Sequence, residues 1–206
     1  MILPIYLYGS NILSKNCKNV DLESQELHSF IKNMFKTLKK SNGIGLAAPQ
    51  VGRDVRLFII NTSFIKELSK DEKLKEVFIN PHVISVSKEK YISNEGCLSI
   101  PFLSDVAVER YNEVKVGYYN NKLKYIERVL TGKLSIVFQH EFDHLEGVLL
   151  VDKLSLAQKL KYKKEIENLL TKNQITYSFE TFEDILKFLM VLTKENKYLS
   201  YPSCLA

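Results

Sequence analysis

The chain has 206 residues, of which 45% are hydrophobic and 26% are charged, as in a globular domain with a sizeable core. No stretch reaches the roughly 18 consecutive apolar residues that a membrane span needs, so a membrane protein is excluded. The net charge of +5 is mildly basic and spread along the chain, without the basic and aromatic motifs of nucleic-acid binding. We therefore expect no membrane and no DNA partner.

The first residues, MILPIYLYGS, lack the basic region and the cleavage site of a secretory signal, so a cytoplasmic location is expected. Cysteines at positions 17, 97 and 204 are too few and too scattered for a disulfide framework. In a reducing compartment a conspicuous cysteine is more often a metal ligand or a nucleophile. Cys97, which follows a glycine in EGCLS, is the conspicuous one.

The first predicted helix covers residues 21–40, because Leu27, Ile31, Met34 and Leu38 recur at helical spacing before the Ser-Asn-Gly stop at 41–43. The glycine-rich segment GIGLAAPQVG at 43–52 follows it. This segment lacks the glycine spacing of phosphate-binding loops. It is either an ordinary turn or a place where the backbone comes close to a substrate.

Several short strands are predicted next, each rich in β-branched or aromatic residues. Two are buried strands at 55–60 and 77–81, the second ending at Asn80 and Pro81, with a lysine-rich surface connection between them. Three more, at 106–110, 114–119 and 125–131, are separated by polar turns and suggest an antiparallel meander. Helices and strands without a βαβ rhythm indicate an α+β fold.

A largely buried helix is predicted after Gly132, with Gly147 as its stop. A second helix follows from about 155 to 172, and the stretch 173–206 differs in character, with a capping signal ahead of ILKFLMVL. We predict a catalytic domain at 1–172 and a helical extension at 173–206 that packs on the core. Dimer or partner contacts are the alternatives for that extension.

The sequence QHEFDH at 139–144 places His140 and His144 four residues apart, so both rings lie on one helix face and can bind one metal ion. A catalytic metal usually has three protein ligands and one open position. The third ligand could be Glu165, as in a zinc peptidase, or Cys97, since a thiolate binds metals strongly. By itself the histidine pair is only modest evidence for a metal site, because such pairs also occur by chance.

The three segments GIGLAAPQ (43–50), EGCLS (95–99) and QHEFDH (139–144) together resemble the three motifs of the peptide deformylases, in the same order and with similar separations. The resemblance extends from the first residues to about 170. It implies a fold of antiparallel sheets packed around a central metal-binding helix, with a C-terminal helix. It also implies a metal-dependent hydrolase that removes the N-formyl group from the N-terminal methionine of new polypeptides and releases formate.

The resemblance assigns roles to individual residues. The implied metal ligands are Cys97, His140 and His144, and Glu141 is implied as the general acid and base. The oxyanion donors would be the Gln50 side chain and the backbone N–H of Leu98.

The implied peptide site has a backbone part and a side-chain part. Ile44 and Gly45 would pair with the backbone of an extended peptide, which gives affinity without selecting side chains. Ile136 and Val137 could wall a methionine pocket, with plain core packing equally expected. Ser104 stands near the position where many family members have an arginine that contacts the peptide, so that contact is absent here or replaced by Phe102 and Leu103.

Asp143 is expected to be a second-sphere residue or a member of a helix ion pair rather than a ligand, and Glu95 is expected to brace the turn that carries Cys97. The family favours Fe²⁺, with Zn²⁺ an alternative in purified protein. The lysines of KLKYKK at 159–164 suggest a weak ribosome contact. Two other functions remain: a zinc peptidase that uses Glu165, and a ribosome-associated module with a structural metal.

Overall fold

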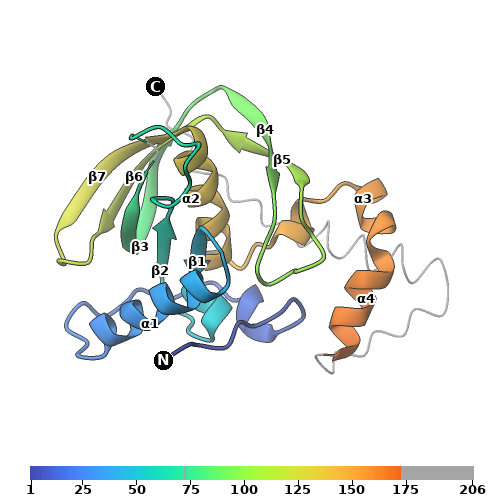
Figure 1. Ribbon diagram of the computed structural model, residues 1–206, viewed down its shortest axis with the longest axis horizontal. Coiled ribbons are helices and arrows are strands. Elements are labelled where there is room, and N and C mark those ends of the chain that lie inside the picture. Colours follow the sequence, from blue (N-terminus) through green and yellow to red (C-terminus); the bar gives the residue numbers. More distant parts are fainter. Residues whose placement is uncertain (72, 173–206) are drawn as a thin grey trace.

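The computed structural model describes residues 1–71 and 73–172, which form an α+β fold (Figure 1). A five-stranded antiparallel sheet has the order β1-β2-β3-β6-β7, and β4 and β5 form a separate antiparallel pair. The strands are β1 (Gly45–Ala47), β2 (Leu57–Asn61), β3 (Lys75–Val86), β4 (Lys90–Glu95), β5 (Val106–Tyr111), β6 (Glu113–Tyr119) and β7 (Tyr125–Thr131). The helices are α1 (Leu27–Lys40), α2 (Gly132–Leu145), α3 (Leu156–Lys161) and α4 (Lys163–Lys172), with 3-10 turns η1 (Asn11–Ser14), η2 (Ala48–Val51) and η3 (Leu150–Lys153).

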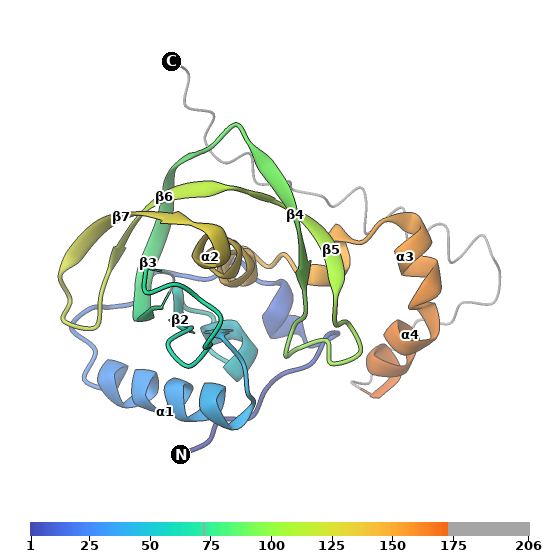
Figure 2. The ribbon, with the colours of Figure 1, turned by 45° about the horizontal axis from the view of Figure 1, so that its top comes forward.

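Helix α2 lies between the two sheets, which Figure 2 shows in a view along the helix. The predicted fold of antiparallel sheets around a central helix is therefore confirmed. The predicted extension at 173–206 lies outside the described residues. Within 1–71 and 73–172, no helix is long and apolar enough to cross a membrane.

The large sheet is covered on both faces. Phe58 and Phe78 stack with ring centroids 4.8 Å apart, and Phe138 of α2 meets them edge-on at 5.3 and 5.4 Å. Successive strand residues point to opposite faces, so Ile59 packs instead with Met34 of α1. Burying one such side chain stabilises the fold by about 1.5–3 kcal/mol. This packing fixes α2, and with it the HExxH segment, against the sheet.

A separate apolar cluster joins the small sheet to the C-terminal helices. Val106 and Val108 of β5 pack in one cluster with Leu150 of η3 and Ile166 of α4. Cys97 belongs to the same cluster, so this packing anchors the loop that carries it.

The strand predicted to end at Asn80 and Pro81 instead continues through them to Val86. Asn80 adopts a left-handed conformation with φ 49°, and the register with β6 shifts between Ile79 and His82. This irregularity accommodates a proline within the strand, where the ladder would otherwise lose a donor. The bent β3 thereby pairs with β2 in its first half and with β6 in its second.

Strand β4 was not predicted, and the meander prediction for 106–131 was wrong in part. β5 pairs with β4 rather than with β6, while β6 and β7 pair as expected. β4 was missed because its burial pattern is inverted: Ile92 is 65% exposed, while Ser93 and Glu95 are buried. Hydrophobic alternation therefore gives no signal for this strand.

Two helix boundaries also differ from prediction. α1 begins at Leu27 rather than at 21, because the Asp21 side chain accepts the backbone N–H of Glu23 at 3.0 Å and stabilises a turn. The helix predicted at 155–172 is divided at Tyr162 into α3 and α4. Its beginning was predicted well, since Ser155 caps α3 by accepting the backbone N–H of Gln158.

Candidate metal centre

Cys97, His140 and His144 converge within the described part of the chain, with one ligand atom of each lying within 4.8 Å of the others. The histidines come from successive turns of α2, and Cys97 follows β4. The Cys97 Sγ and His144 Nε2 atoms are 3.4 Å apart. Two ligands of one tetrahedral Zn²⁺-like ion lie roughly 3.3–3.8 Å apart, so the spacing fits one shared ion.

Glu165, the other candidate for third ligand, is exposed on α4 and is not part of this group. Burial lowers the pKa of His144 well below its usual value, which keeps the ring neutral, as a metal ligand must be. The donor set of one sulfur and two imidazoles suits Fe²⁺ or Zn²⁺. The arrangement therefore fits a divalent metal held by Cys97 and the two histidines.

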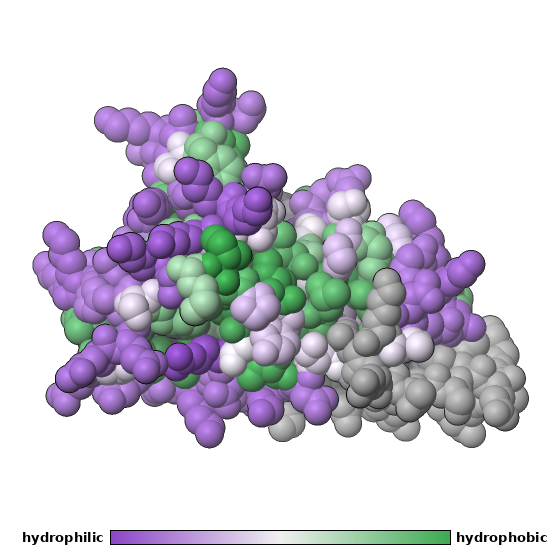
Figure 3. All heavy atoms as spheres, turned by 60° about the horizontal axis from the view of Figure 1, so that its bottom comes forward, coloured by the Kyte–Doolittle hydropathy of each residue, from purple (hydrophilic) through white to green (hydrophobic). Residues whose placement is uncertain are grey.

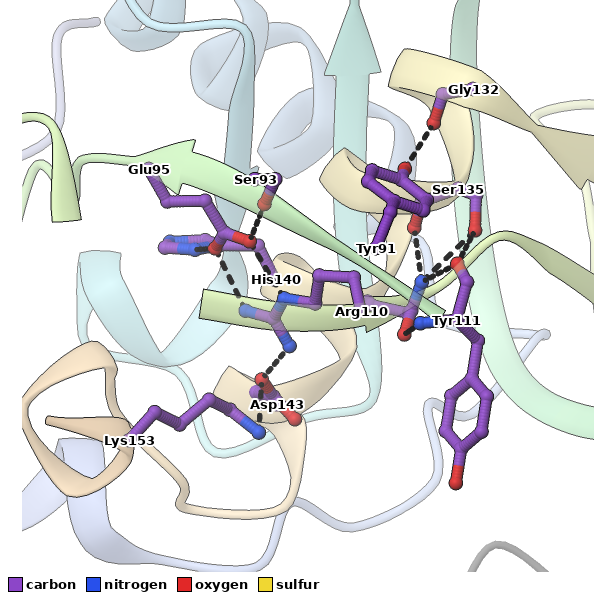
Figure 4. Close-up of polar contacts among 11 residues, drawn as sticks. Tyr91, Ser93, Glu95, Arg110, Tyr111, Gly132, Ser135, His140, Asp143 and Lys153 are labelled. Atoms are coloured by element: carbon purple, nitrogen blue, oxygen red, sulfur yellow. Dashed lines mark hydrogen bonds and ion pairs between the residues drawn. The ribbon is translucent and has the colours of Figure 1, made fainter. Parts of the chain in front are cut away.

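A buried ion-pair network surrounds His140 (Figure 4). The Nδ1 atom of His140 lies 2.9 Å from Glu95 Oε2, which leaves Nε2 of the ring available to a metal. Arg110 donates to both oxygens of Glu95, at 2.7 and 2.8 Å, and to Asp143 at 2.6 Å. Lys153 adds a second cation, 3.1 Å from Asp143. Glu95 thus supports His140 on α2, whereas the sequence interpretation expected it to brace the turn that carries Cys97. Asp143 is held in ion pairs with Arg110 and Lys153, as expected for a residue that is not a ligand.

The network changes the ionisation of its members. Burial by itself would raise the pKa of Glu95, but hydrogen bonds from Arg110 and His140 outweigh burial and hold this pKa well below its usual range. Burial likewise opposes a charged His140, yet its contacts with Cys97 and Glu95 raise the pKa of His140 well above its usual value. A metal ion that binds at His140 must therefore displace a proton.

Sequence reasoning missed Arg110, although a signal was present. Val106, Val108 and Arg110 alternate along β5 and all three are buried, so the arginine lies on the apolar face of its strand. A buried arginine requires carboxylate partners.

Glu141 is buried beside the ligands, and burial raises its pKa to about 7. Its Oε2 atom has no hydrogen-bond partner within the described residues. A Cβ atom added to Gly45 would lie against this carboxylate, 2.7 Å from its Cδ. Glycine at position 45 therefore leaves room for the Glu141 side chain.

Gln50 is also buried, and the backbone fixes its orientation. Its Oε1 accepts the backbone N–H of Ala47 at 2.8 Å, so its NH₂ group faces Ser99 Oγ at 3.2 Å and Cys97 Sγ at 3.8 Å. The amide donor is thereby directed toward the metal ligands. Ser99 was not identified from the sequence.

These side chains border a pocket of about 440 Å³, a volume in the usual range for small-ligand sites. The predicted substrate and catalytic residues that line it are Ile44, Gly45, Gln50, Leu98, Ile136, Val137 and Glu141. Other lining residues were not predicted: Asn42, Asn94 and Lys133. Leu103 and Ser104 also line it, whereas Phe102 packs against Tyr162 instead. In the view of Figure 3, hydrophobic surface gathers at the centre of the face and hydrophilic residues surround it.

Comparison with known proteins gives a consistent result. The family model "Polypeptide deformylase" matches residues 2–160. The peptide deformylase of Karelsulcia muelleri is 41% identical over 159 residues, covering 77% of this chain and 81% of that protein. The one from Christiangramia forsetii is 37% identical over 188 residues, covering 87% and 95%.

Solved structures similar to this chain are also peptide deformylases. A peptide deformylase from Plasmodium falciparum superposes with a TM-score of 0.75 at 33% identity, covering 84% of this chain and 99% of that one. The Thermotoga maritima peptide deformylase gives 0.68 at 36% identity, covering 75% and 99%.

Proposed function

Because the chain belongs to the peptide deformylase family, it is a metal-dependent hydrolase that removes the N-formyl group from formyl-methionyl peptides, and we propose which of its residues carry out that reaction. The observation that carries the proposal is the convergence of one cysteine and two histidines next to the buried carboxylate of Glu141, whose Oε2 has no hydrogen-bond partner among the described residues. The lining residues of the pocket supply the remaining groups that the reaction needs.

Cys97, His140 and His144 hold the metal, and Fe²⁺ is the native ion, with Zn²⁺ able to occupy the same donors. When bound, such an ion lowers the pKa of a water molecule and polarises the formyl carbonyl. Glu95 holds His140 in the tautomer that directs Nε2 away from the network, which supports this assignment.

Glu141 acts as general base and then as general acid. A formamide is a poor electrophile, so water must lose a proton as it attacks, and the departing amine must gain one. A carboxyl group with a pKa of about 7 can accept and return a proton near neutral pH. Its unpartnered Oε2 supports this role, because no protein hydrogen bond described here competes for it.

Gln50 and Leu98 stabilise the negative oxygen of the tetrahedral intermediate. The amide NH₂ of Gln50 already faces the metal ligands, and the backbone N–H of Leu98 directly follows Cys97. Removing one such donor commonly costs about 3–4 kcal/mol of transition-state stabilisation.

The peptide binds along β1. This strand lies at the edge of the large sheet, and the pocket is lined by its first residue, Gly45, and by Ile44 directly before it. Backbone pairing at a sheet edge suits many different nascent chains. Ile136 and Val137, from the pocket side of α2, bound the methionine side chain.

The decisive experiment is formate release from formyl-Met-Ala-Ser by protein prepared anaerobically with Fe²⁺, beside Glu141→Ala and Glu141→Gln. The parent should release formate, and both variants should lose nearly all activity while they keep the same metal content. Full activity in Glu141→Gln would remove the proposed role. No release by a fully loaded parent would overturn the function and direct attention to unformylated peptides.

Residues 1–172 would form the catalytic domain, and the cytoplasm is the proposed location, since new polypeptides carry their formyl groups where they are made.

A weak ribosome contact through α3 and α4 remains part of the proposal, with one correction. Lys159 is only 3% exposed, so Lys161, Lys163 and Lys164 are the lysines left to make it. Unchanged ribosome co-sedimentation after their neutralisation would remove this contact.

A further inference from the structure

We propose that the backbone of the N-terminal segment positions the two oxyanion donors relative to each other, with Tyr6 and Tyr8 as positioning residues. The N–H of Tyr6 donates to the carbonyl of Gln50 at 2.8 Å, and the N–H of Tyr8 donates to the carbonyl of Ser99 at 2.9 Å. The inference rests on the proposed function and deepens it by naming what holds the donors in place.

Tyr6 fixes the backbone from which the first donor extends. Gln50 is 1% exposed, and its own carbonyl is the group that the Tyr6 N–H holds. The Tyr6 ring also lies over the next turn, because a Cβ atom added to Gly52 would come 2.8 Å from the Cε2 atom of that ring. The amide group of Gln50 therefore depends on the N-terminal segment for its position.

Tyr8 fixes the turn that carries the second donor. The N–H of Ile100 donates to the carbonyl of Cys97 at 3.0 Å, so Leu98 and Ser99 occupy the middle of a tight turn. The Tyr8 N–H holds the Ser99 carbonyl of this turn. That bond fixes the orientation of the turn, and with it the direction of the Leu98 N–H.

The segment joins two loops that are distant in the sequence. Gln50 Nε2 also donates to Ser99 Oγ at 3.2 Å, so side chains and backbone connect the same two residues. The two backbone donors lie two residues apart, which is the spacing of N–H groups along one side of an extended chain. The segment is itself anchored, because the N–H of Leu3 donates to Thr37 Oγ1 of α1 at 2.8 Å. Loss of one backbone bond would therefore shift one oxyanion donor relative to the other.

The experiment removes one N–H at a time and leaves every side chain unchanged. A synthetic peptide of residues 1–16 is joined to residues 17–206 through Cys17, which gives the full chain. The amide that precedes Tyr6 or Tyr8 is replaced by an ester, so an oxygen atom takes the place of the N–H. The all-amide protein made in the same way is the parent.

Two further esters are matched controls. The N–H of Leu7 makes no hydrogen bond with any described residue, so an ester there removes no bond. The ester at Tyr8 also weakens the Leu7 carbonyl, which accepts the N–H of Ser10 at 3.1 Å. An ester at Ser10 removes that bond alone and controls for it.

At equal metal content, the esters at Tyr6 and Tyr8 should each lower kcat on formyl-Met-Ala-Ser about five- to tenfold. A misplacement of about 1 Å can cost on the order of 100-fold, and the loss of one bond shifts a group by less. KM should stay within about twofold, because the oxyanion forms only after substrate binds. The two control esters should keep the parent kcat.

Gln50→Ala separates positioning from a general loss of structure. Without the amide donor, the ester at Tyr6 should cause no further fall in kcat, whereas the ester at Tyr8 should still lower it through Leu98. A Tyr6 ester that costs the same factor with and without Gln50 would overturn the proposal. So would esters at Tyr6 and Tyr8 that leave kcat at the level of the controls.

The parent distinguishes failure of this inference from failure of the proposed function. If the metal-loaded parent releases no formate, the proposed function fails. If the parent is active and the esters behave as the controls do, only the positioning role is overturned.

Discussion

The guanidinium of Arg110 binds both carboxylate oxygens of Glu95, at 2.7 and 2.8 Å, in a setting where both side chains are almost fully buried. Glu95 in turn holds His140, and Arg110 also reaches Asp143 on the same helix. The pair therefore connects β5 to the metal-binding face of α2.

Replacing Arg110 by Met should destabilise the fold strongly, by about 3–5 kcal/mol, because Glu95 and Asp143 would lose their main buried cation. Urea unfolding of the metal-free protein measures the change. Lys90→Met is the matched control, since it breaks an exposed ion pair with Glu109 and should have little effect. Equal losses in the two variants would contradict a special role for the buried pair.

Stability should fall in acid through Glu95. Its pKa is lowered in the folded state, so its ionised form stabilises the fold above the ordinary carboxyl value of about 4.3, and this contribution is lost as the pH falls through that value toward the lower pKa of the folded state. In metal-free protein the slope of unfolding free energy against pH should flatten in Glu95→Gln. Glu89→Gln, at an exposed position, should keep the parent slope.

Metal binding should depend on Cys97 and not on Glu165. Cys97→Ala removes one of three convergent donors, so the metal content after dialysis should fall well below one ion per chain. Glu165→Ala changes an exposed side chain on α4 and should retain full content. The reverse outcome would restore the zinc peptidase interpretation.

Gly45→Ala should reduce activity without removing the metal. The new methyl group would collide with the Glu141 carboxylate and displace it, and a misplacement of about 1 Å can cost on the order of 100-fold in rate. Formate release and metal analysis on the same sample test this. A loss of metal in step with activity would show that the damage is not confined to Glu141.

Much of the site was predictable because its information is local in sequence. His140, Glu141 and His144 lie within one and a half turns of one helix, so helical periodicity already brings the histidines to one face. Cys97 was one of two candidates for the third ligand until the three motifs were taken together, and Gln50 was identified only through those motifs. Their convergence required the folded chain, which brings the loop after β4 to the side of α2.

The sequence by itself determined the identity of the family, the α+β class and the helix that carries both histidines. Only the tertiary structure decided that Arg110 supports the metal centre, that Ser93 and Glu95 form the buried face of β4, and that Lys159 is buried. The physical reason is the same in each case. Burial of a polar side chain depends on partners distant in the sequence, whereas helical periodicity and motif spacing depend only on neighbouring residues.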